Sequence, residues 1–185
     1  GEGADQITIG AGQDTVNLAE VTPAADNLIW ATAFAAGNAN AATVSNFAFG
    51  AGIDTIDIQV NLTNGGTGPT SNLAALAPVA VVSNGTATTN DVIFTFNGAG
   101  DILAAGTTVA TAVANAVTAL TSGTDFSSAN IAAADSLILQ MNDGTNTFVF
   151  HYVAGGVAAT TEAGDLTLIG MFSGTTTQAL TGDFI

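Results

Sequence analysis

The chain has 185 residues, 48% of them hydrophobic, and it carries 15 acidic residues but no lysine, arginine or cysteine, so its formal net charge is −15. The absence of cysteine excludes disulfides and thiolate metal sites, and no uninterrupted run of about 18 apolar residues is present that could span a membrane. The charge would repel nucleic acid and anionic membrane surfaces. Because no cationic side chain can pair with them, the acids must be solvated, hydrogen-bonded to backbone N–H groups, or neutralised by a metal ion.

Two tandem repeats open the chain, Gly1–Ile9 and Gly10–Leu18, and share the pattern G-x-G-x-D-x-(I/V)-x-(I/L). The glycines permit a turn with positive φ that gathers backbone carbonyls, and the aspartate adds an anionic oxygen. Hard oxygen ligands suit Ca²⁺, so the pattern predicts a calcium-binding parallel β-roll. The predicted ligands are the carboxylates and carbonyls of Asp5, Asp14, Gly1, Gly3, Gly10 and Gly12.

The geometry of a roll limits which of these residues can share one ion. Two repeats make one coil, so Asp5 and Asp14 should lie on opposite sides, each with its partners one coil away, at about eighteen residues. Alternatively, each aspartate only caps its own turn. Since the full repeat has one more residue before Gly1, we also expect the chain to be a piece of a longer polypeptide.

A third copy of the glycine and aspartate pattern occurs at Gly50–Ile56, where Asp54 and Asp57 are further candidate calcium ligands. This segment could stack on the roll and complete a site, or it could be only a turn into the following strand. Glu20, Asp26 and Asp101 are spare acids, whose default interpretation is a solvated surface and whose alternative is a calcium contact between subunits.

The remaining elements follow from periodicity and turn signals. Alternation predicts a strand at 55–60, further strands are expected at 79–83, 91–96 and 166–172, and a polar loop is expected at 61–72. An apolar stripe predicts one helix over 107–121, capped by Thr107 or Thr108 and ended by Gly123. The turn Asn142–Thr145 predicts a hairpin of strands 136–141 and 147–153. Trp30 is expected to close a core.

These motifs resemble the RTX (repeats-in-toxin) family of bacterial proteins secreted by type I systems. Beyond the repeats, the segments Asp26–Trp30 and Val44–Ile58 are similar to the part that follows the roll, although Asn46 stands where the family has an aspartate. Asp165–Gly170 and Leu180–Ile185 are similar to the family's C-terminal tail. The resemblance implies an uncleaved C-terminal secretion signal and an extracellular location on the bacterial cell surface.

We therefore expect a mostly β fold, in which a short parallel β-roll edge leads into a β-sandwich or layered β-sheet with one short helix. The expected domains are an RTX β-roll remnant at 1–25 and a β-rich C-terminal domain at 26–185, which includes the secretion-signal-like tail.

Three classes of function compete for this chain. The composition is similar to that of RTX surface-layer proteins, which favours an extracellular structural protein that self-assembles into a surface layer or filament. Its expected cofactor is Ca²⁺. Its expected partners are its own copies, and cell-surface polysaccharide is a further candidate partner. The alternative is a calcium-dependent folding and secretion module of a larger RTX adhesin or hydrolase. An enzyme is not expected, because His151 is the only histidine and no nucleophile motif accompanies it.

Overall fold

The structure is a computed structural model in which ten strands, one α-helix and a short 3₁₀ turn are placed. The described residues are 1–30, 37–50, 53–58, 82–83, 93–96, 103–122, 136–155, 163–176 and 183. The predicted loop at 61–72, Asp101 and the predicted helix end at Gly123 lie outside these residues.

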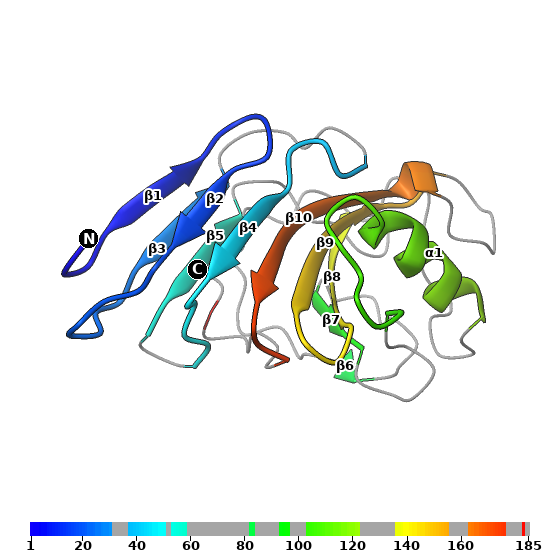
Figure 1. Cartoon of the computed structure of the whole chain (residues 1–185). Coiled ribbons are helices and arrows are strands. Elements are labelled where there is room, and N and C mark those ends of the chain that lie inside the picture. Colours follow the sequence, from blue (N-terminus) through cyan, green and yellow to red (C-terminus); the bar gives the residue numbers. More distant parts are fainter. Residues whose placement is uncertain are drawn as a thin grey trace.

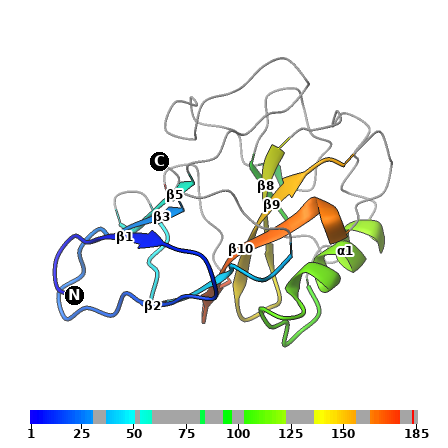
Figure 2. The ribbon, with the colours of Figure 1, turned by 90° about the horizontal axis from the view of Figure 1, so that it is seen from above.

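The N-terminal part of the chain winds as a roll between two sheets. Successive strands alternate between a three-stranded sheet, with order β1-β3-β5, and the first strands of a second sheet, β2 and β4. All neighbouring pairs here are parallel, and the two sheets form separate layers (Figure 2). The strands are β1 (Gln6–Ile9), β2 (Thr15–Asn17), β3 (Asn27–Trp30), β4 (Ala42–Ser45) and β5 (Thr55–Ile58).

The second sheet continues beyond the roll to seven strands in the order β2-β4-β10-β9-β8-β7-β6. β10 pairs parallel with β4 and antiparallel with β9, so it joins the roll to the C-terminal strands (Figure 1). The added strands are β6 (Val82–Ser83), β7 (Ile93–Thr95), β8 (Ser136–Asn142), β9 (Thr147–Val153) and β10 (Leu166–Ser173), which the 3₁₀ turn η3 (Ala163–Asp165) precedes.

Among the described residues, one continuous apolar core runs through the roll and the larger sheet. In β3 and β5 the side chains alternate, so that Leu28, Trp30, Ile56 and Ile58 are buried while their neighbours are half-exposed. In β8 and β9 almost every side chain is buried, which means that both faces of this part of the sheet are covered. The prediction that Trp30 closes a core is confirmed.

The predicted hairpin of β8 and β9 is confirmed, and its turn chemistry explains it. Gly144 has a φ of 85°, which a residue without Cβ adopts freely. Asp143 Oδ1 accepts hydrogen bonds from the N–H groups of Thr145 (2.9 Å) and Asn146 (2.7 Å). The side chain thus closes the turn between the two strands.

The helix α1 (Ala112–Ser122) begins later than predicted, and the predicted caps Thr107 and Thr108 are wrong. Thr107 instead donates from both its N–H and its hydroxyl to the carbonyl of Ala104, which closes a turn before the helix. The helix start is held by Asn38, whose Oδ1 accepts from the N–H of Val113 (3.3 Å). A cap supplied by a residue far away in the sequence could not be predicted from the local pattern.

The predicted fold class is confirmed, since the described residues are mostly β, with parallel and mixed sheets and one short helix. β3 pairs with β1 along its whole length, so one sheet runs across the boundary predicted between residues 25 and 26. Among the described residues, no helix is long and apolar enough to cross a membrane.

Candidate metal centre

Three aspartates form a ladder at the start of the three-stranded sheet. Asp5, Asp26 and Asp54 each directly precede a strand, and the register of β1, β3 and β5 stacks them in successive coils. Asp26 Oδ1 accepts from the N–H of Asp5 (2.9 Å), and Asp54 Oδ1 accepts from the N–H of Asp26 (3.0 Å). Each carboxylate therefore holds the backbone of the preceding coil, and both Asp26 and Asp54 are only 3% exposed.

The aspartates of the two tandem repeats each contact the first glycine of their own turn, and Asp5 belongs to a three-carboxylate cluster as well. Asp5 Oδ2 lies 3.1 Å from the nitrogen of Gly1, and Asp14 Oδ2 accepts from the N–H of Gly10 at 3.1 Å. The second glycine of each repeat takes a positive φ, 94° at Gly3 and 103° at Gly12. The turn conformation expected from the repeat pattern is confirmed at these two glycines.

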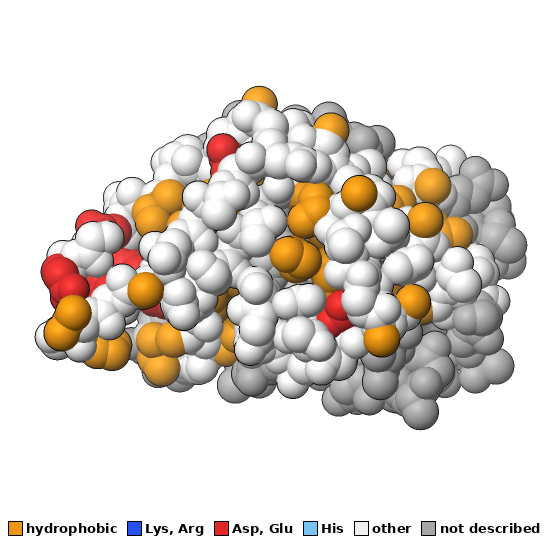
Figure 3. Space-filling view, in the orientation of Figure 1, with side chains coloured by type: hydrophobic (Ala, Val, Ile, Leu, Met, Phe, Trp, Pro, Cys, Tyr) orange, Lys and Arg blue, Asp and Glu red, His pale blue; other side chains and the backbone are white. Residues whose placement is uncertain are grey.

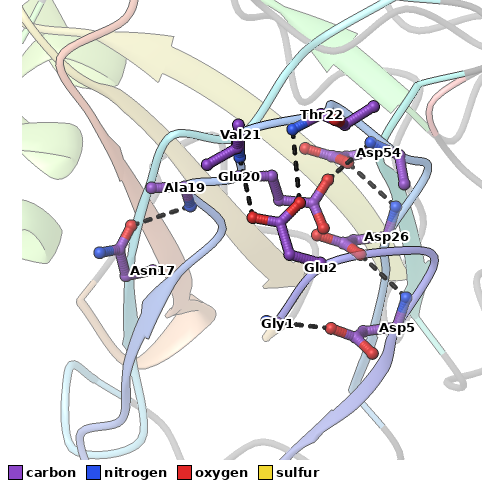
Figure 4. Close-up of polar contacts among 11 residues, drawn as sticks. Gly1, Glu2, Asp5, Asn17, Ala19, Glu20, Val21, Thr22, Asp26 and Asp54 are labelled. Carbon is purple, nitrogen blue, oxygen red and sulfur yellow. Dashed lines mark hydrogen bonds and ion pairs between the residues drawn. The ribbon is translucent and has the colours of Figure 1, made fainter.

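A fourth carboxylate, that of Glu20 in the connection between β2 and β3, lies beside two members of the ladder. One carboxylate oxygen each of Asp5, Glu20 and Asp26 lies within 4.8 Å of the others (Figure 4). Glu20 Oε2 accepts from the N–H of Ala24 (2.6 Å), whereas its Oε1 is buried without a hydrogen-bond partner. A buried oxygen without a donor is energetically unfavourable, so this cluster has unsatisfied capacity for a cation.

The loop that carries Glu20 is itself fixed by a second acid. The carboxylate of Glu2 accepts from the N–H groups of Val21 (3.0 Å) and Thr22 (3.4 Å), and this ties the loop back to the first turn of the chain. Acidic side chains consequently gather at the end of the molecule where the roll begins (Figure 3). No lysine or arginine in the sequence can neutralise them.

The donor set of the cluster fits Ca²⁺. Calcium takes carboxylate and carbonyl oxygens at about 2.3–2.6 Å, so two oxygens bound to the same ion are at most about 5 Å apart. The oxygens of Asp5, Glu20 and Asp26 meet this limit without rearrangement of the backbone. A calcium ion there would also supply the partner that Glu20 Oε1 lacks.

The pKa of Asp54 reflects its burial and the neighbouring negative charges at this end of the roll. Burial raises the pKa of its carboxyl group above the ordinary value, and the charges of Asp26 and Glu20 raise it further, against the lowering effect of hydrogen bonds from the N–H groups of Ala48 and Asp26. Asp54 and Glu20 both line a cleft of about 230 Å³ between residues 18–24 on one side and residues 46–48 and 53–54 on the other.

Several predicted ligands lie away from the cluster. Asp14, Gly10 and Gly12 precede β2 in the other sheet, where the N–H of Gly12 donates to Asn40 Oδ1 (2.8 Å) rather than lying beside a second acid. Asp57 lies within β5, half-exposed between the buried Ile56 and Ile58. Of the predicted acids, only Asp5 belongs to the three-carboxylate cluster, and Asp54 stacks one coil beyond it.

The default interpretation of Asp26 as a solvated surface acid is wrong, because Asp26 is buried, and both Asp26 and Glu20 belong to the cluster. A signal for Asp26 was present in the sequence: like Asp5, Asp14 and Asp54, it has apolar residues two and four positions later. The absence of glycines before it concealed the repeat. The sequence separations of 21 between Asp5 and Asp26 and 28 between Asp26 and Asp54 concealed it as well.

His151 lies in β9, apart from these acids. Its Nε2 is 2.6 Å from Ser136 Oγ, across the β8–β9 pair. Burial lowers the pKa of His151 to about 4, so the imidazole is neutral at neutral pH. The register also confirms the prediction that His151 shares a face with Gln140 and Val149.

Comparison with protein-family models, with curated proteins and with solved structures found no match for this chain. The resemblance to the RTX family therefore stays a prediction that rests on the motifs.

Proposed function

We propose that this chain is an extracellular structural protein, stabilised by Ca²⁺, that self-assembles into a surface layer or filament. The observation that carries the proposal is the cluster of Asp5, Glu20 and Asp26, in which one buried carboxylate oxygen lacks a partner. In a chain without lysine or arginine, a divalent cation is the simplest way to neutralise this cluster.

The arrangement of strands supports assembly through the end of the molecule where the roll begins, which also holds the cluster of Asp5, Glu20 and Asp26. β1 and β2 are the outermost described strands of their sheets, and both belong to the first coil of the roll. Edge strands have backbone N–H and C=O groups that can pair with another chain. Because each copy has a net charge of −15, close packing requires that cations screen or bridge the subunits.

We expect concentrated protein to form regular filaments or sheets in calcium and to remain dispersed in EDTA with sodium chloride, as seen by negative-stain electron microscopy. Monovalent salt should substitute poorly, because it screens charge without bridging carboxylates. Glu20→Gln should weaken assembly in calcium, since it removes a ligand charge from the cluster.

The matched control is Asp165→Asn, which removes the same charge at a site where the carboxylate accepts from the N–H of Gly155, away from the cluster. If both variants impair assembly equally, net charge rather than the cluster governs it. Assembly that is equally good in EDTA would mean that strand-edge or hydrophobic contacts, and not calcium, hold the subunits together.

The second candidate function is a calcium-dependent folding and secretion module of a larger RTX adhesin or hydrolase. One observation favours it: Asp183, in the secretion-signal-like tail, is fully buried and accepts from the N–H of Gly50 at 2.8 Å. A residue near the C-terminal end that contacts the roll suits a module whose folding completes at that end. Calcium-dependent stability with dispersed monomers at every protein concentration would favour this alternative over self-assembly.

A further inference from the structure

Asp183 connects the C-terminal end of the chain to the last turn of the roll. Its side chain is 0% exposed, and its Oδ1 accepts from the N–H of Gly50 at 2.8 Å, across a sequence separation of 133 residues. A carboxylate is stable in such a buried position only when hydrogen bonds or a cation compensate for its lost hydration. The hydrogen bond from Gly50 therefore helps to stabilise the buried Asp183 carboxylate.

The turn that Asp183 contacts also holds the last aspartate of the ladder. Among residues 48–50 and 53–54, Ile53 N–H donates to the Gly50 carbonyl (3.2 Å) and Asp54 N–H donates to the Ala48 carbonyl (3.3 Å). Asp54 Oδ2 in return accepts from the N–H of Ala48 (2.8 Å). The position of the Asp54 carboxylate thus depends on the closure of this turn.

From Asp54 the same kind of contact continues to the first coil. Asp54 holds the N–H of Asp26, and Asp26 holds the N–H of Asp5, so carboxylate-to-amide hydrogen bonds run from the turn to the candidate metal centre. The other side of the turn is anchored in the core, where the rings of Phe47 and Phe49 lie 4.9 and 5.3 Å from that of Phe172 in β10. Asp183 is the contact that holds the turn at Gly50.

We propose that Asp183 is a positioning residue for the candidate metal centre: by holding Gly50 next to Ile53 and Asp54, it orders the aspartate ladder and so raises the affinity of the first coil for Ca²⁺. The calcium part of this inference rests on the proposed function, whereas the ordering of the ladder does not. Contiguous hydrogen bonds between elements with discrete arrangements are a physical route for such coupling. Coupling between sites typically changes affinity by roughly 5- to 150-fold, and we expect the lower end here, because the contacts lie in series.

The first experiment measures amide hydrogen exchange by NMR without calcium, in wild type and in Asp183→Ala. We expect faster exchange at the amides of Gly50, Asp26 and Asp5, by roughly tenfold or more at Gly50, with the β8–β9 turn unchanged. The matched control is Asp143→Ala, which removes another buried acid that caps a turn. It should speed exchange at Thr145 and Asn146 and leave the ladder unchanged.

Asp183→Asn separates positioning from charge, because an amide retains the Oδ1 acceptor for Gly50. It should restore slow exchange at Asp26 and Asp5 and supply the folded sample if Asp183→Ala does not fold. Acceleration confined to Gly50, equal acceleration in the ladder and the hairpin, or unchanged exchange in Asp183→Ala would each overturn the inference.

The second experiment titrates Ca²⁺ into the same variants. We expect Asp183→Ala to bind Ca²⁺ roughly five- to tenfold more weakly than wild type, and Asp183→Asn to bind nearly as tightly. Unchanged affinity in Asp183→Ala despite a loosened ladder would overturn the calcium part of the inference. If wild type itself binds no calcium, the proposed function fails, and the exchange data still decide whether Asp183 orders the ladder.

Discussion

Asp26→Ala is expected to destabilise the calcium-loaded protein by roughly 4 kcal/mol, and to abolish most of the stabilisation that calcium gives. The Asp5 N–H would lose its acceptor in a partly buried site, which costs about 1–3 kcal/mol. The cluster would also lose a ligand, and a bound ion at a hundredfold excess over its Kd contributes about 2.7 kcal/mol. Without calcium the loss should be smaller, because the substitution also removes one of several mutually repelling charges.

The measurement is urea unfolding of wild type and Asp26→Ala, each in calcium and in EGTA. Asp14→Ala is the matched control, since Asp14 has the same place in its repeat as Asp5 but lies at the start of the other sheet. Asp14→Ala should lower the free energy of unfolding by the same amount in calcium and in EGTA, because it removes only the cap of its own turn. The stabilisation by calcium should be the same as in wild type. An equal calcium response in wild type and Asp26→Ala would place the ion elsewhere.

Lowering the pH from 7 to 4 is expected to reduce the free energy of unfolding through His151, by an amount of the order of 3 kcal/mol. Burial lowers the pKa of His151 to about 4 from 6.5, so between these values the unfolded chain binds a proton that the folded chain does not. Stability therefore falls as the pH falls through this window and levels off below about 4. The raised pKa of Asp54 acts in the opposite direction, because its protonation is easier in the folded state and favours folding at acid pH.

His151→Gln isolates the histidine contribution, since glutamine can still hydrogen-bond to Ser136 Oγ and does not titrate. Urea midpoints collected from pH 4 to 7 in EGTA should show a steeper slope in wild type than in the variant. Identical slopes would mean that His151 titrates alike in the folded and unfolded chains.

The regular elements of this fold could be predicted because their signals are local. Alternating apolar residues mark β5, the Asn142–Thr145 turn marks the hairpin, and the apolar stripe that includes Val113, Val117 and Leu120 marks α1. Each pattern depends on residues close together in the sequence. The later start of α1 depends instead on Asn38, which approaches from the connection between β3 and β4.

The candidate metal centre could be predicted only in part, for a related reason. The tandem repeats identify Asp5 and the kind of turn that it occupies, and they imply that a partner lies one coil away. Coil lengths that depart from a fixed repeat leave the identity of that partner open, so Asp26 had to be found from the strand register. Glu20 follows no repeat, and only the path of the loop brings it to the ladder.

Isothermal titration of Ca²⁺ into the metal-free wild-type chain tests the central claim most directly, with the double variant Glu20→Gln, Asp26→Asn as comparison. Wild type should bind calcium with a measurable heat and show a higher melting temperature in calcium, because the ion relieves the repulsion among Asp5, Glu20 and Asp26. The double variant, which retains neutral oxygens of the same shape, should show neither effect. No binding by wild type up to millimolar calcium, with an unchanged melting temperature, would contradict the account and leave the aspartate ladder as a purely structural device.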